Sequence, residues 1–80
     1  MLLEKILYIE SHLHKLIFYI NEDKLNEYTI LMTLNAMENQ MKDLGFIRIH
    51  QSYLVNLKHI KKIKNYVAYL NNGKELSIAK

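Results

Sequence analysis

The chain has 80 residues, of which 50% are hydrophobic and 24% charged, with four histidines and no cysteine. This composition is typical of one small globular domain, and it excludes a disordered chain, a disulfide-stapled fold and a cysteine-ligated zinc site. No apolar run reaches the roughly 18 residues that a membrane span needs. Because Glu4 follows the first apolar residues at once, no secretory leader is expected either, and we expect a cytoplasmic protein.

The formal net charge is +3, but the charge is distributed unevenly along the chain. Residues 1–44 carry four lysines against seven acidic residues, a balance of −3. Residues 45–80 carry seven basic residues against Glu75 alone, a balance of +6. A basic half-domain is a candidate surface for a polyanion such as nucleic acid. Charge blocks also occur on ordinary solvated surfaces, so the asymmetry alone leaves both interpretations open.

The first part of the chain is predicted to form short strands. Ile6–Ile9 and Lys15–Ile20 are apolar runs rich in β-branched and aromatic residues, which is typical of buried strands. The polar residues Asn21–Lys24 form a turn cluster, after which Leu25–Thr29 can return as a third strand.

One amphipathic helix is predicted over Leu34–Leu44. Its apolar stripe, spaced at i, i+3, i+7 and i+10, consists of Leu34, Met37, Met41 and Leu44. Thr33 is the expected N-cap, and Gly45 is expected to end the helix in a left-handed conformation. A stripe of this kind packs a helix onto a sheet far more often than it binds a partner.

The stretch Gly45–Ile63 is the most informative part of the sequence. It first alternates, with Phe46, Arg48 and His50 expected on one side of a strand and Ile47 and Ile49 on the other. A polar step, a second apolar run and a cluster of lysines follow. Buried apolar residues, outward hydrogen-bonding side chains and concentrated positive charge together suit a surface that holds nucleic acid.

The last part of the chain is predicted to be a β-hairpin, with strands Tyr66–Leu70 and Glu75–Ile78. The intervening Asn71–Lys74 contains Asn-Gly, the strongest short-range hairpin signal, because both residues tolerate positive φ. The sequence therefore predicts a single α+β domain over residues 1–80. This domain is mostly β, with one amphipathic helix and five to seven short strands in small antiparallel sheets.

The central motif resembles that of the LytTR DNA-binding domain of bacterial response regulators. The residues that carry the resemblance are Arg48, His50, Ser52, Tyr53, Val55 and Asn56, with Gly45-Phe46 before them and Ile60 and Ile63 after them. The strand at Ile6–Ser11 and the Asn72-Gly73 turn also fit. The resemblance implies the mostly β fold and sequence-specific binding of double-stranded promoter DNA at direct repeats. It implies loops inserted into the major groove, within a two-component transcription regulator.

Family members also usually carry a strand ahead of the Ile6–Glu10 equivalent, a basic tail after Ile78–Lys80, and a receiver domain. Against that pattern, this chain is expected to be a domain core trimmed at both ends, without the receiver domain. A missing edge strand would leave an unpaired edge, and pairing of two chains along it as a homodimer fits this interpretation.

The resemblance assigns base reading to three loop residues, which are His14, Gln51 and Lys80. Gln can bond an adenine edge through two hydrogen bonds, whereas Lys80 replaces the Arg that relatives use and lacks its planar fork. Each has a simpler alternative: His14 as a turn cap, Gln51 as a solvated side chain, and Lys80 as a disordered chain end.

Seven further residues are expected to contact the DNA backbone or to support the readers, and they are Arg48, His50, Ser52, Asn56, Lys58, Lys61 and Lys62. For Arg48 and His50, two roles are expected as alternatives, contact with the DNA backbone and structural hydrogen bonding. Asn56 is expected to secure a turn rather than to touch DNA. The lysines are phosphate candidates or a solvated face.

Catalysis, metal binding and a cofactor are not expected. His12 and His14 would share a face of a strand, but no HExxH or comparable spacing supplies further ligands. Ser52 with His50 or His59 lacks the Gly-rich elbow of a nucleophile. The alternative to a DNA-binding domain is a protein-interaction module that self-associates through an exposed edge and has weakened DNA contacts.

Overall fold

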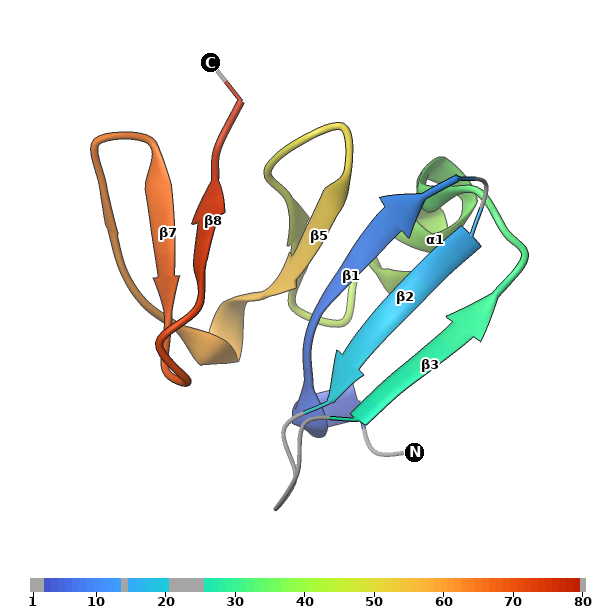
Figure 1. Ribbon diagram of the computed structural model, residues 1–80, viewed down its shortest axis with the longest axis horizontal. Helices are drawn as coiled ribbons and strands as arrows, with labels where there is room; N and C mark the ends of the chain where they lie inside the picture. The colour runs from blue at the N-terminus through green and yellow to red at the C-terminus, as the bar shows by residue number, and fades with distance from the viewer. Residues whose placement is uncertain (1–2, 14, 21–25, 80) are drawn as a thin grey trace.

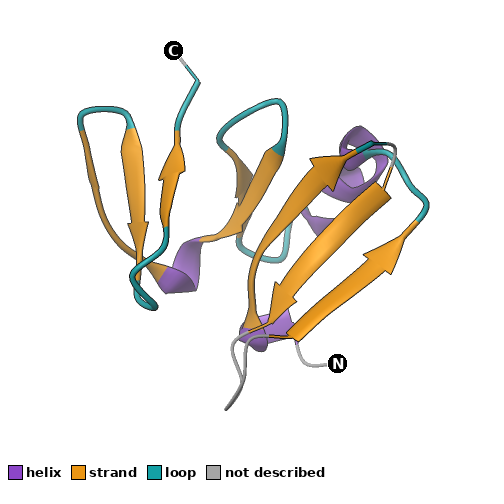
Figure 2. Ribbon diagram, viewed as in Figure 1, coloured by secondary structure: helices purple, strands orange, loops and turns teal. Residues whose placement is uncertain are grey.

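The computed structural model describes residues 3–13, 15–20 and 26–79, and these form eight strands, one α-helix and two short 3-10 helices (Figures 1 and 2). The elements in chain order are η1 (Leu3–Lys5), β1 (Ile6–His12), β2 (Lys15–Ile20), β3 (Asn26–Ile30), α1 (Leu34–Met41), β4 (Phe46–Arg48), β5 (Tyr53–Asn56), η2 (Leu57–His59), β6 (Ile60–Lys64), β7 (Val67–Leu70) and β8 (Glu75–Ser77). The predicted α+β class, mostly β with small antiparallel sheets, is confirmed.

The strands form two antiparallel sheets. The larger has the order β3-β2-β1-β5-β4 and the smaller the order β6-β7-β8 (Figure 1). Strand β1 is central, since it pairs with β2 on one side and with β5 on the other. The expected unpaired edge therefore does not lie beside β1. In the described part of the chain, the outer edges of the larger sheet are β3 and β4.

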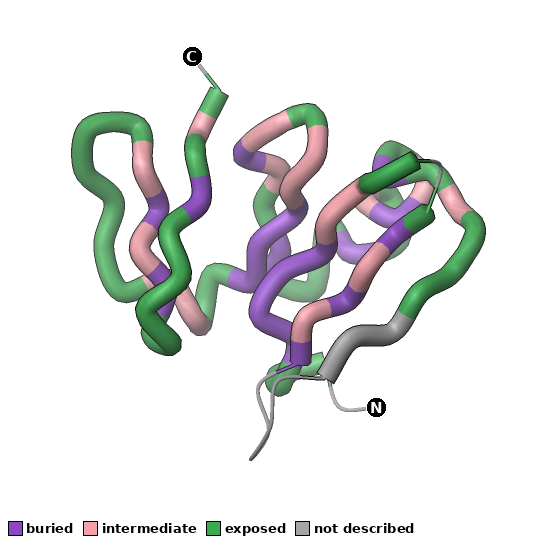
Figure 3. Tube along the Cα trace, viewed as in Figure 1, coloured by how far each residue is buried: buried purple, intermediate pink, exposed green. Residues whose placement is uncertain are grey.

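Two hydrophobic clusters hold the molecule together, one on each face of the larger sheet. Figure 3 shows buried residues along the strands of both sheets. The first cluster packs α1 onto the sheet and consists of Ile6, Ile9, Leu16, Phe18, Ile20, Leu34, Met37, Met41, Phe46 and Leu54. The second packs the smaller sheet onto the other face and consists of Leu7, Tyr8, Ile49, Val55, Ala68, Leu70 and Leu76. Because β1 contributes to both clusters, all of Ile6–Ile9 is buried, which explains its continuous apolar run.

The helix begins as predicted but ends earlier. The Thr33 side chain accepts a hydrogen bond from the Ala36 N–H at 3.1 Å, which is the expected N-cap. The helix stops at Met41, where the Leu44 N–H bonds the Met41 carbonyl at 2.9 Å and tightens the chain into a turn. Leu44 therefore leaves the apolar stripe and is 49% exposed. Gly45 then takes the expected positive φ of 84°.

Three further expectations need correction. The alternation from Phe46 stops at Arg48, so Ile47 is exposed while Ile49 enters the second cluster. Most of the lysine cluster, Ile60–Lys64, is itself a strand, β6, because the next turn folds it onto β7, and this raises the strand count above seven. The strand predicted from Tyr66 begins one residue later, since Tyr66 lies in that turn.

The C-terminal hairpin follows its prediction closely. The Asn71–Lys74 loop joins β7 to β8, and Gly73 has a φ of 93°. The Asn72 side chain accepts a hydrogen bond from the Lys74 N–H at 3.0 Å, a local bond that Asn favours in turns. No helix in the described residues is long and apolar enough to cross a membrane.

Met41→Ala is expected to lower the free energy of unfolding by about 2–5 kcal/mol, because Met41 is 8% exposed and packs in the first cluster. The measurement is urea denaturation. Leu44→Ala is the matched control, since Leu44 lies one turn further along but outside the helix, and its effect should be much smaller. Equal effects of the two substitutions would contradict this packing.

Alkaline pH is expected to destabilise the fold through Tyr8. Burial raises the pKa of Tyr8 far above its ordinary value, and the neighbouring Tyr19 and Glu10 raise it further. The folded state therefore keeps the phenol proton at a pH where the unfolded chain has lost it. This stability is fully present below about pH 10 and is lost as the pH rises above it. Urea midpoints measured between pH 8 and about pH 11 should fall less steeply for Tyr8→Phe than for the wild type. Parallel curves would refute the assignment to Tyr8.

Candidate nucleic-acid interface

The loop between β4 and β5 contains Gln51 and is held by the guanidinium of Arg48. Nε of Arg48 donates to the His50 carbonyl at 2.7 Å, and Nη2 donates to the Gln51 carbonyl at 2.7 Å. Nη1 donates to Oδ1 of Asn35 at 2.8 Å and to Oε1 of Glu38 at 2.9 Å, both on α1. One planar fork thus fixes the loop backbone to the helix. All three nitrogens of the Arg48 guanidinium form hydrogen bonds within the protein. Of the two roles predicted for Arg48, this geometry favours structural hydrogen bonding over contact with the DNA backbone.

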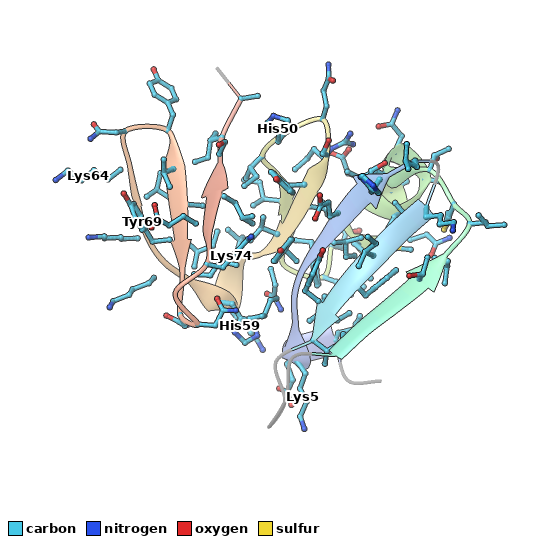
Figure 4. All side chains as sticks on the ribbon, in the orientation of Figure 1. Lys5, His50, His59, Lys64, Tyr69 and Lys74 are labelled. Atoms are coloured by element: carbon cyan, nitrogen blue, oxygen red, sulfur yellow. The ribbon has the colours of Figure 1, made fainter. Side chains whose placement is uncertain are left out.

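His50 and Ser52 shape the same loop from within. Nδ1 of His50 accepts a hydrogen bond from the Ser52 N–H at 3.1 Å, which assigns its proton to Nε2 when the ring is neutral. The imidazole also packs against the Tyr53 ring, with 5.2 Å between the ring centres. Figure 4 shows His50 in this loop, beside the strands of the larger sheet. The polar step that interrupted the predicted strand is therefore an ordered loop, which holds Gln51 exposed at its tip.

Main-chain hydrogen bonds join this loop to two other segments at the same end of the molecule (Figure 1). The Ser11 N–H donates to the Ser52 carbonyl at 2.9 Å, which joins the end of β1 to the Gln51 loop. The Ala79 N–H donates to the Ile49 carbonyl at 2.8 Å, which brings the segment after β8 beside it. Of the three predicted base readers, His14 and Lys80 lie outside the described residues. Ser11 precedes His14 by three residues, and Ala79 directly precedes Lys80.

A depression of about 350 Å³ adjoins the Gln51 loop. Its lining comes from the end of β1, the start of α1 and the loop itself, and consists of Ser11, Met32, Thr33, Leu34, Asn35, Arg48 and Gln51. This end of the molecule therefore presents polar side chains on a surface that the Arg48 fork holds in place.

The predicted phosphate-binding lysines do not all lie together. Lys61 and Lys62 are exposed on β6, the outer strand of the smaller sheet. The Lys62 ammonium lies 4.9 Å from the centre of the Tyr69 ring, which holds it on the outer face of that sheet. Lys64, which sequence reasoning passed over, is exposed on the same strand and points away from the body of the protein (Figure 4).

Lys58 lies instead at the opposite end, in η2. It lines a depression of about 320 Å³ with Leu3, Glu4, Leu44 and Asn56, far along β5 from the Gln51 loop (Figure 1). Among the described lysines 58, 61, 62, 64 and 74, none forms an ion pair with a described acidic residue. The positive charge of β6 is therefore available to a polyanion.

Asn56 is a structural residue. It is 3% exposed, and its Nδ2 donates to the Ile6 carbonyl at 2.9 Å while its Oδ1 accepts from the Lys58 N–H at 3.0 Å. These bonds secure the turn into η2, as the local bonding habit of Asn led us to expect. In the described part of the chain, no group of three or more potential ligand side chains could hold a metal ion.

Comparison with known proteins gives a consistent result. Residues 1–80 match the LytTR family, described as the LytTr DNA-binding domain. The transcriptional regulatory protein LytR of Staphylococcus aureus (strain N315) is 33% identical over 60 residues, which cover 69% of this chain and 24% of LytR. The sensory transduction protein LytT of Bacillus subtilis (strain 168) is 30% identical over 60 residues, which cover 69% of this chain and 25% of LytT. The matched region is thus about a quarter of the length of these curated relatives.

A solved structure shares the fold. The LytTr DNA-binding domain of a Bacillus cereus protein superposes with a TM-score of 0.82 at 26% identity, and the match covers 95% of this chain and 72% of that one. The family match over the whole chain, the curated relatives and this structure agree with the central motif and the loops around it. The chain belongs to the LytTR family of DNA-binding domains, which is not a family of enzymes.

Proposed function

We propose that residues 1–80 act as the DNA-reading output domain of a cytoplasmic, two-component transcription regulator of bacteria. The domain inserts the loops at one end of its two sheets into the major groove of promoter DNA. The observation that carries this proposal is the pair of main-chain bonds, Ser11 to Ser52 and Ala79 to Ile49, which join the end of β1, the Gln51 loop and the segment after β8 at that end. Loops fixed to one another can enter a groove without a large loss of conformational entropy on binding.

Gln51 is the reader that this geometry supports best. Its backbone carbonyl is held by Arg48 while its side chain is exposed, so the amide projects from a fixed point. A fixed amide can make the paired hydrogen bonds that distinguish adenine from other bases. His14 and Lys80 are proposed as the other readers, because the chain on either side of this loop leads to them.

Phosphate contacts are assigned to Lys61 and Lys62, whose exposed strand borders the smaller sheet. Lys58 lies at the far end, so its contact would need DNA that extends or bends around the domain. Arg48, His50, Ser52 and Asn56 support the readers through the hydrogen bonds described above rather than by touching DNA.

The proposed operator is a direct repeat, with one domain on each repeat. A homodimer is proposed to form through the outer edge of β3, which pairs with β2 over five consecutive residues without a bulge. The end of this strand and the residue after it are apolar and exposed, with Ile30 at 41% and Leu31 at 81%. A regular edge with exposed apolar residues is suited to strand pairing, and it equally favours the alternative function of a self-associating interaction module.

Gln51→Ala and Lys61→Ala are expected to weaken DNA binding in different ways. Gln51→Ala should cost about 1–3 kcal/mol on the preferred site and relax the choice at one base pair. Lys61→Ala should weaken all duplexes about equally and reduce the salt slope by about one unit. The measurement is titration of both variants with a selected duplex and a scrambled duplex at several salt concentrations.

Different outcomes would contradict the roles of the single residues and the function of the whole domain. If Gln51→Ala weakens both duplexes alike, Gln51 is not a reader. If neither variant changes affinity, the DNA surface lies elsewhere. If the wild type binds no duplex but self-associates, the interaction module is the correct function.

Arg48→Lys is expected to loosen the Gln51 loop while preserving the charge, because an ammonium cannot bridge four acceptors in the geometry of a guanidinium. Hydrogen exchange at the Ser52 N–H should accelerate, and discrimination between selected and scrambled duplexes should fall. Lys74→Arg is the control, since it changes an exposed cation in the β7–β8 loop without touching the Gln51 loop. Unchanged exchange and unchanged discrimination in Arg48→Lys would refute the positioning role.

A further inference from the structure

The turn between β6 and β7 has a backbone that its sequence does not favour. Lys64 pairs with Val67, so Asn65 and Tyr66 alone make the connection. Both have positive φ, 52° for Asn65 and 62° for Tyr66. A two-residue hairpin with two positive φ values normally has Asn or Gly first and Gly second. A tyrosine at the second position carries the steric cost of the left-handed region, which a glycine would avoid.

This turn lies at the same end of the molecule as the end of β1, the Gln51 loop and the segment after β8 (Figure 1). The Ile78 N–H donates to the Tyr66 carbonyl at 2.8 Å, and the next residue, Ala79, bonds the Ile49 carbonyl at 2.8 Å. The main-chain bonds therefore continue from the end of β1, through the Gln51 loop and the segment after β8, to the β6–β7 turn. Tyr66 is 57% exposed there. A strained turn thus presents a large aromatic side chain at the DNA-facing end.

We propose that Tyr66 is a fourth DNA contact, which binds the sugar-phosphate backbone of the duplex that Gln51 reads. This inference rests on the proposed function. The phenol hydroxyl can donate one hydrogen bond to a phosphate oxygen, while the ring packs on a deoxyribose. Lys64, exposed two residues earlier on β6, adds a cation for the same or a neighbouring phosphate.

The chemistry of the side chain favours backbone over base. A phenol offers a single rotating hydroxyl and cannot form the paired bonds that distinguish one base edge from another. Contacts to phosphate and sugar set the position of a protein on the duplex and carry no sequence information. Tyr66 is therefore expected to fix how the reading end lies over the groove, and to act on all sequences equally.

The test compares Tyr66→Gly and Tyr66→Phe with the wild type in the full 80-residue chain. Each protein is titrated with the selected and the scrambled duplex, and its melting temperature is measured. Glycine suits the positive φ, so the melting temperature of Tyr66→Gly should be unchanged or raised. Its affinity should fall by about 5- to 20-fold on both duplexes alike, and Tyr66→Phe, which retains the ring, should show a smaller equal loss. Leu57→Ala is the control, because Leu57 is 50% exposed at the opposite end and should leave affinity unchanged.

Three results would overturn the inference while leaving the proposed function in place. These are wild-type affinity in Tyr66→Gly, a loss confined to the selected duplex, and a loss matched by Leu57→Ala. If Tyr66→Gly melts at a lower temperature than the wild type, the affinity of Tyr66→Phe becomes the deciding measurement. A Tyr66→Phe affinity equal to that of the wild type would then show that the tyrosine stabilises the fold and does not contact DNA through its hydroxyl. A wild-type chain that binds neither duplex would refute the proposed function itself, and this inference with it.

Discussion

The burial of β1 on both faces is the constraint on which the rest of the structure depends. Ile6 and Ile9 pack under the helix, while Leu7 and Tyr8 pack under the smaller sheet. Burial of apolar surface stabilises a fold by about 25 cal/mol per Å², so each of these two small cores contributes little by itself. Because the two cores share β1, each core stabilises the strand on which the other packs. In a domain of this size neither core is large enough to remain folded without the other, so the two sheets and the helix are expected to unfold together.

That shared strand also explains why the functional end can be made of loops. Loops are usually the more mobile parts of a domain. Here the β4–β5 loop, which we propose enters DNA, leaves strands that are paired within a sheet, and main-chain bonds connect it to the end of β1 and to the segment after β8. The Arg48 fork adds a link from the β4–β5 loop to α1, which gives the helix a part in shaping the proposed DNA surface that its apolar stripe does not suggest.

Local signals in the sequence predicted local structure well. The Thr33 cap, the Asn-Gly hairpin and the positive φ of Gly45 each depend on chemistry within a few residues. The prediction failed where a distant partner decides the outcome. Leu44 continues the apolar periodicity, yet the chain must turn there to enter β4. The lysine-rich stretch becomes β6 only because the strained turn folds it onto β7. The partners of Arg48 on α1 lie 10 and 13 residues away, and no spacing rule identifies them.

The buried amide of Asn56 has a consequence for how such domains can diverge. It sits where the chain passes from the larger sheet to the smaller one, and it ties that passage to the Ile6 carbonyl at the start of β1. Asn56 thus helps to set the angle between the two sheets, together with the contact of the His59 ring with the Glu4 carbonyl, at the end of the molecule remote from the Gln51 loop. A change in these contacts would tilt the β6–β7 hairpin relative to the Gln51 loop. Under the proposed function, such a tilt would alter the distance between neighbouring DNA contacts, so that the preferred spacing of DNA sites could evolve through a residue that does not touch DNA.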